Sequence, residues 1–249
     1  MKNIEKFNIS ELEKDFQKNG FCIIKNLFNR SEIRKISNEI NIYIKSNLKK
    51  FKPNEINFVN NKPNSVHNFN NSKYLTALSS HRSIMIIAEH ILQSKVKLKA
   101  MEYFAKPRKI GLPSPAHQDN FYWCLKKNLG VVMWISLNQS SKKNGSVYYY
   151  KGSHKLGLLD HEPSYAPGSS QKVTAKGIKK IKNVRRCFVS LEPGDCLVHH
   201  CLVVHGSEKN RSTMDRKGFV MQFVSSTDTV DQNKLYNYRK SLEKQISIR

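Results

Sequence analysis

Three side chains have the types and the spacing of an iron ligand set. His117 and Asp119 are separated by one residue, and His205 follows far downstream. Two imidazoles and one carboxylate can occupy one face of an iron(II) ion and leave the opposite face open. An open face is what a metal needs if it must bind oxygen and a second ligand together. The set therefore predicts a non-haem iron oxygenase.

An arginine completes this set. Arg216 lies eleven residues after His205, and its guanidinium could hold a carboxylate of the second ligand with paired hydrogen bonds. Arg211 competes for the same role, but it lies in a polar turn where a solvated side chain is expected. Arg216 opens the last predicted strand and can point into the fold, so we favour Arg216.

Two further histidines, His199 and His200, are close enough in the sequence to replace His205 as the third ligand. In a regular strand, residues 199 and 205 lie on the same face, so strand alternation does not reject His199. We favour His205 because only this histidine is followed by Gly-Ser and stands eleven residues before Arg216. His199 or His200 would then pack, or donate hydrogen bonds behind the ligands.

Short strands are expected to position both ligand segments, because a strand held in a scaffold fixes the side chains at its end. The turn-rich segment Gly111–Pro115 leads to His117. The tight turn Glu192–Asp195 is followed by an apolar run that leads to His205. We therefore expect both ligand sites at the ends of short strands.

The N-terminal part of the chain shows helical patterns. A capping box that starts at Ser10 begins one helix, and Gly20 ends it. A second helix is predicted from Asn29, with isoleucines at helical spacing, and a third over residues 75–92. Residues 49–72 are polar and rich in asparagine, which predicts a long loop, either a lid over the site or a surface excursion.

The pattern then changes to short, β-rich segments that are separated by Gly, Pro, Asn and Ser. These segments are residues 96–104, 131–137, 146–150, 187–191, 196–204 and 218–225. Several short strands closed by turns predict a mostly β fold, a double-sheet jelly roll with the helices packed on the outer face of one sheet. A polar insert, residues 155–182, either covers the mouth of the barrel or is a disordered loop.

The ordered series of motifs resembles the phytanoyl-CoA dioxygenase family of iron- and 2-oxoglutarate-dependent oxygenases, from about residue 10 to about residue 225. The segments that carry the resemblance are Asn19–Phe28, His117–Asp119, Val131–Leu137, Asn144–Ser146, Lys151–His154, Gly194-Asp195, His205–Ser207, Asn210 and Arg216. The family usually has proline where this chain has Lys151, a departure that concerns a turn and not the metal.

The resemblance implies a cupin-like double-stranded β-helix in which His117, Asp119 and His205 bind iron(II). It implies that Arg216 binds the distal carboxylate of 2-oxoglutarate. Ser207 would assist Arg216, and Trp134 would line the cosubstrate pocket. The implied reaction consumes oxygen and 2-oxoglutarate, releases succinate and hydroxylates an unactivated C–H bond. Asp119 favours hydroxylation over halogenation, because a related halogenase has a small residue in place of this carboxylate.

The substrate is expected to be a small polar or anionic metabolite. Its candidate contacts flank the metal motif and are Lys106, Arg108, Gln118, Asn120, Tyr122 and Trp123. Two other classes of function stay open. One is a non-catalytic jelly-roll binding protein, against which the complete ligand set argues, and the other is an oxygenase that acts on nucleic acid.

The formal net charge of +24, from 43 Lys and Arg against 19 Asp and Glu, suggests an anionic partner such as nucleic acid, a membrane surface or an acidic metabolite. Coding bias is the alternative, because the chain is rich in Lys, Asn and Ile together. The basic residues form short, dispersed clusters and no recognised nucleic-acid motif accompanies them. We therefore do not expect nucleic acid as the partner.

The length of 249 residues predicts a single domain. We expect a helical part at about 1–95, a jelly-roll core at about 96–226 and a C-terminal tail at 227–249. The sequence contains no apolar run long enough to span a bilayer and no apolar core of a signal peptide. Five cysteines without a Cys-x-x-Cys argue against disulfides or zinc and predict a cytoplasmic protein. The oligomeric state is not indicated.

Overall fold

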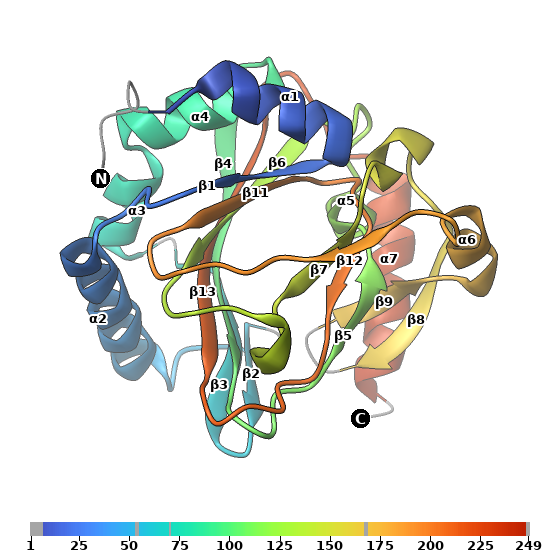
Figure 1. Cartoon of the computed structure of the whole chain (residues 1–249). Coiled ribbons are helices and arrows are strands. Elements are labelled where there is room, and N and C mark those ends of the chain that lie inside the picture. Colours follow the sequence, from blue (N-terminus) through green and yellow to red (C-terminus); the bar gives the residue numbers. More distant parts are fainter. Residues whose placement is uncertain (1–6, 53–54, 70, 167–168, 248–249) are drawn as a thin grey trace.

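The computed structural model describes residues 7–52, 55–69, 71–166 and 169–247, whose strands form two main antiparallel sheets and a smaller hairpin (Figure 1). The larger sheet has the spatial order β1 (Phe21–Ile24), β11 (Cys196–His200), β6 (Gly130–Ser136), β13 (Arg216–Ser225), β4 (Val96–Lys106), β3 (Lys62–His67) and β2 (Ile56–Val59). The smaller sheet has the order β10 (Arg186–Phe188), β7 (Val147–Tyr150), β12 (His205–Ser207) and β5 (Ser114–His117).

Helices cover the outer face of the larger sheet. They are α1 (Ile9–Asn19), α2 (Arg30–Asn47), α3 (Lys73–Ser79) and α4 (Arg82–Leu92). Strand β6 shows how the two faces differ: Met133 packs with these helices, whereas Val132 and Trp134 pack on the other face with Tyr149 of β7. The predicted jelly roll, mostly β with N-terminal helices on the outside, is confirmed.

The helix ends follow capping signals, with two corrections to the prediction. Helix α2 begins at the predicted cap, Asn29. Helix α1 begins before Ser10, because the side chain of Asn8 caps it. The single helix predicted over residues 75–92 is divided into α3 and α4, because His81 leaves the helical conformation and its side chain accepts a hydrogen bond from the first turn of α4.

The asparagine-rich stretch 49–72, predicted as a loop, contains the β2–β3 hairpin within its described residues. This hairpin extends the larger sheet because β3 pairs with β4. Along β3, Val66 is buried against the helices, whereas the buried Ser65 lies on the opposite face. The side chains alternate as strand residues do, but the polar composition hides this pattern in the sequence.

The polar insert 155–182 is also structured in its described residues. It contains the hairpin of β8 (His161–Ala166) and β9 (Ser169–Val173), followed by α6 (Ala175–Lys180). Residues 167–168 of the insert lie outside the described ranges. Short 3-10 helices, η2 (Lys142–Asn144) and η3 (Ser153–Leu156), flank β7.

Where the sequence predicts a C-terminal tail, the structure has the helix α7 (Gln232–Ser247). In Figure 1 this helix lies on the side of the molecule formed by β5, β8 and β9, and it contacts β8 and the short helix α5 (Asp119–Trp123). The chain thus returns, after the last strand of the larger sheet, to the region of the predicted metal ligands.

The five cysteines all lie in described residues and are free thiols. Among the described helices, none combines the length and the apolar surface that a bilayer crossing requires.

Candidate metal centre and its cavity

The register of the smaller sheet brings the two predicted histidine ligands together. His117 ends β5 and His205 begins β12, and the two residues are direct partners across this antiparallel pair. Their imidazole centroids are 4.3 Å apart. Asp119 follows β5 as the first residue of α5, so its carboxylate reaches the same point.

The ligand atoms of His117, Asp119 and His205 all lie within 4.8 Å of one another. The Oδ1 atom of Asp119 is 3.8 Å from the Nε2 atom of each histidine. This donor set of two nitrogens and one oxygen suits non-haem iron(II). The residues therefore fit the metal that the sequence predicts.

Backbone carbonyls fix the protonation of both imidazoles. The Nδ1 atom of His117 donates to the carbonyl of Pro115 at 2.8 Å, and that of His205 donates to the carbonyl of Val203 at 3.0 Å. Because a carbonyl only accepts, the proton lies on Nδ1 and the lone pair of Nε2 is free to bind a metal.

The charge states are also those that a metal needs. Burial, and then the nearby His205, lower the pKa of His117 to about 4, so its imidazole is neutral at pH 7. Burial alone would raise the pKa of Asp119, but His205 and a hydrogen bond from His199 outweigh it and hold this pKa below its ordinary value. Neutral imidazoles beside an ionised carboxylate are ready to coordinate a cation.

His199 occupies a different place from the three ligands. It lies on β11, in the larger sheet, and its Nε2 atom is 2.9 Å from the Oδ2 atom of Asp119. Strand β11 ends at His200, and residues 201–204 cross to the smaller sheet before β12 begins. The prediction of one continuous strand over 196–204 is therefore wrong, and His199 and His205 approach the site from opposite sheets.

Arg216 is the first residue of β13 and is only 5% exposed. Its Nε atom is buried without a hydrogen-bond partner among the described residues. Burial lowers the pKa of Arg216 to about 10, so the guanidinium remains charged at pH 7. A buried cation with an unused donor is costly unless an anion binds it. The site therefore fits a carboxylate ligand, as 2-oxoglutarate would supply.

Trp134 and Ser207 lie in the same cavity as Arg216. The guanidinium carbon of Arg216 lies 5.3 Å from the centre of a Trp134 ring. Gly218 permits this arrangement: a Cβ atom there would lie 2.0 Å from the Cζ2 atom of Trp134. The sequence reasoning did not single out Gly218, although a glycine two residues after the arginine on one strand face is a signal for such a close approach.

These residues open onto a cavity of about 870 Å³ between the two sheets. Besides the predicted site residues, its wall includes Ser65 and His67 of β3, Lys99 and Glu102 of β4, Gln222 of β13, and Tyr238, Leu242 and Ile246 of α7. Ser169 and Ser170 from the polar insert also line it. The cavity is thus walled partly by the segments that the sequence reasoning treated as loop, insert and tail.

The six predicted substrate contacts divide into two groups. Tyr122, Trp123 and Lys106 line the cavity. The Nζ atom of Lys106 donates to the carbonyls of Leu112 and Glu208, so its amino group holds backbone segments together.

The other three lie outside the cavity lining. Arg108 is exposed, and proline at 107 ends the strand before it. The buried side-chain amide of Gln118 donates to the carbonyls of Gly157 and Leu202 and accepts from the N–H of Leu159. The buried side-chain amide of Asn120 donates to the carbonyl of Leu125 and to the side chain of Asn128, and it accepts from the N–H of Leu125. The prediction placed these residues by proximity in sequence, but the side chains of Gln118 and Asn120 point into the scaffold, and Arg108 is exposed outside the cavity lining.

Lys99 is a cavity residue that the sequence did not reveal. The pairing of β13 with β4 changes register, since Gln222 is opposite Ala100 and Phe223 is opposite Leu98. Lys99 is therefore the extra residue of a β-bulge, and a bulge turns a side chain to a face that regular alternation would deny it.

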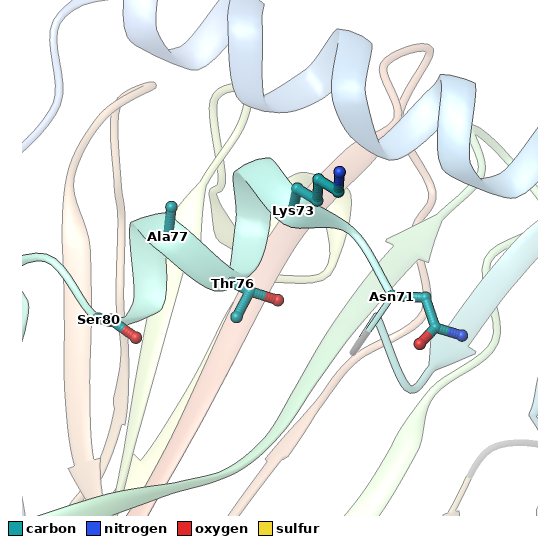
Figure 2. Close-up of a pocket in the computed structure, with 5 residues that line it drawn as sticks. All are labelled: Asn71, Lys73, Thr76, Ala77 and Ser80. Atoms are coloured by element: carbon teal, nitrogen blue, oxygen red, sulfur yellow. The ribbon is translucent and has the colours of Figure 1, made fainter.

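A second hollow, of about 540 Å³, lies along α3 (Figure 2). It is lined by Asn71, Lys73, Thr76, Ala77 and Ser80. These five residues include no histidine, cysteine or carboxylate, so the cavity between the sheets is the candidate active site.

Comparisons with known proteins identify a family and a fold to which this chain is similar. The family model of phytanoyl-CoA dioxygenase (PhyH) matches residues 16–218. The peroxisomal phytanoyl-CoA dioxygenase of Homo sapiens is 26% identical over 236 residues, which cover 87% of this chain and 68% of the human protein.

Two solved structures show the same fold. One is the α-ketoglutarate-dependent carbocyclase SnoK from nogalamycin biosynthesis, with a TM-score of 0.77, 18% identity, and coverage of 92% of this chain and 88% of SnoK. The other is EctD from S. alaskensis with 2-oxoglutarate and 5-hydroxyectoine, with a TM-score of 0.75, 14% identity, and coverage of 89% of this chain and 78% of EctD.

Proposed function

This chain belongs to the phytanoyl-CoA dioxygenase family, and on that premise we propose that it hydroxylates an unactivated C–H bond of a small polar metabolite that carries an acidic group. It is a non-haem iron, 2-oxoglutarate-dependent dioxygenase. The observation that carries the proposal is one cavity that contains both a three-residue ligand set and a buried guanidinium with an unused donor.

We assign His117, Asp119 and His205 as the residues that would hold iron, through Nε2, Oδ1 and Nε2. The bound iron and 2-oxoglutarate would supply oxidative decarboxylation by dioxygen, which releases succinate and provides the oxidising power for hydroxylation. Arg216 would bind the distal carboxylate of 2-oxoglutarate with two parallel hydrogen bonds, and Ser207 would donate a third. Trp134, packed against Gly218, would keep water away from the contact between Arg216 and the carboxylate.

The acidic group of the substrate is proposed from Lys99. Its ammonium faces the cavity and lies 5.4 Å from a ring centre of Trp123. Among the described residues, no carboxylate forms an ion pair with it, whereas Glu102, three residues along β4, is bonded by His67 and Gln222. A cation that faces a cavity and forms no direct ion pair there favours an anionic ligand. The high positive charge of the chain is in keeping with such a substrate.

We further propose that residues 1–249 act as one domain, because strands near the N-terminus and the last helix wall the same cavity. The five free thiols support a reducing compartment such as the cytoplasm.

The test of the function is succinate formation by the Fe(II)-loaded protein. We expect slow succinate release from 2-oxoglutarate alone and a marked stimulation by one member of a panel of small carboxylates and phosphates. The neutral amide or ester of that member should not stimulate. An iron-loaded protein that forms no succinate with any member would contradict the proposal and favour a binding protein.

Lys99→Met provides a sharper test of the acidic group. The loss of one charge-assisted contact, worth about 1.5–3 kcal/mol, should raise the KM for the stimulating metabolite by roughly tenfold or more. Lys97→Met is the matched control, because Lys97 is an exposed residue of the same strand outside the cavity lining. Equal KM values for the two variants would show that Lys99 does not bind the substrate.

A further inference from the structure

We infer that His199 and Tyr149 form a positioning pair that commits Asp119 to bind the metal through one oxygen. The inference rests on the proposed metal centre and concerns two residues outside its ligand set. The Nε2 atom of His199 lies 2.9 Å from Asp119 Oδ2, and the Oη atom of Tyr149 lies 2.8 Å from His199 Nδ1. Two consecutive hydrogen bonds thus connect Tyr149 of the smaller sheet, through His199 of the larger sheet, to the proposed ligand Asp119.

The chemistry of the groups fixes the direction of the hydrogen bond to Asp119. An ionised carboxylate only accepts, so Nε2 of His199 carries the proton that it donates to Asp119. The Nδ1 atom of His199 lies 2.8 Å from the hydroxyl of Tyr149, which donates to Nδ1 when the imidazole is neutral. Both ring nitrogens of His199 are engaged, which leaves no lone pair for the metal. Tyr149 therefore selects the tautomer in which His199 supports Asp119 and does not compete with it.

The pair is rigid and enclosed. Tyr149 is fully buried and stacks on Phe21 with ring centroids 4.4 Å apart. His199 is 4% exposed. Neither hydroxyl nor imidazole can turn away without leaving a buried polar group unpaired, and such a group is costly. The hydrogen bond to Asp119 is thus held in place by the packing of both sheets.

The consequence concerns the number of positions left on the metal. A carboxylate can bind an ion with one oxygen or with two. His199 occupies Oδ2, while Oδ1 stays 3.8 Å from the Nε2 atoms of His117 and His205. The second oxygen would therefore be withheld from a bound ion, which would leave coordination positions for the cosubstrate and oxygen.

The experiment uses Co(II) as the probe in the metal-free full-length protein, with the dissociation constant and the visible absorption spectrum as readouts. His199→Leu should weaken Co(II) binding by about 10–100-fold and change the band intensities, because the unrestrained carboxylate alters the coordination. Tyr149→Phe keeps the ring and should change both readouts in the same direction by less. His199→Gln keeps an N–H near the position of Nε2 and should bind Co(II) within about threefold of the wild type.

His200→Gln is the matched control, because His200 packs on Phe16 and His154 away from the ligands. The inference is overturned if His199→Leu, or Tyr149→Phe should the former not fold by circular dichroism, has the wild-type affinity and spectrum. It is also overturned if His199→Gln loses Co(II) as fully as His205→Ala, since His199 would then be a ligand. A wild-type protein that binds no Co(II) would instead contradict the metal centre itself.

Discussion

Alanine at His117, Asp119 or His205 is expected to abolish both iron binding and succinate formation. The wild-type protein should take up about one Fe(II) per chain under anaerobic conditions, as a ligand set of this type does. Each substitution removes one of the three ligands, and among the described residues no other His, Cys, Asp or Glu belongs to the ligand set. Anaerobic reconstitution followed by iron analysis and a succinate assay measures both effects.

The fold should survive these substitutions, because the ligands line a cavity and do not form the core. His90→Ala is the control: this exposed histidine pairs with Glu13 on the helical side of the molecule and should keep full iron content. If His205→Ala retains iron and activity, the third ligand has been assigned to the wrong histidine.

Arg216→Lys is expected to raise the KM for 2-oxoglutarate by roughly tenfold or more, since one charge-assisted hydrogen bond is worth about 1.5–3 kcal/mol. Lysine keeps the positive charge but lacks the planar fork that binds a carboxylate through two parallel hydrogen bonds. Iron content should stay near that of the wild type, because Arg216 is not a ligand. The measurement is succinate formation as a function of 2-oxoglutarate concentration.

Arg211→Lys is the matched control for this prediction. Arg211 is exposed in the turn before β13 and is absent from the cavity lining. The KM of the Arg211→Lys variant for 2-oxoglutarate should therefore equal that of the wild type. A rise in KM for Arg211→Lys alone would mean that the cosubstrate carboxylate binds elsewhere.

The ligand set could be predicted from sequence because its signal is local. His117 and Asp119 are two residues apart, and His205 has its own flanking Gly-Ser and its spacing to Arg216. The choice between His199 and His205 could not be made by strand alternation. That argument assumed one regular strand, but the chain leaves the larger sheet after His200. Alternation holds only while a segment stays within one sheet.

The substrate side of the cavity was less predictable, because its residues come from distant segments. The orientation of Lys99 toward the cavity depends on a register change between two strands, and no local sequence pattern predicts a bulge. The β2–β3 hairpin was missed because asparagines dominate a stretch in which Val66 is its buried anchor. Gln118 and Asn120 were expected to contact substrate, but their amides satisfy backbone groups that the fold had to bury.

Helix α7 has a bearing on how such an enzyme changes over evolutionary time. The family model ends at residue 218, whereas α7 begins at Gln232 and contributes Tyr238, Leu242 and Ile246 to the cavity wall. The proposed metal ligands and part of the cavity wall are therefore encoded in separate stretches of the chain. Substitutions in this last helix can reshape what the cavity admits without disturbing the ligands. Selection can then diversify substrates while the oxidation chemistry is inherited intact.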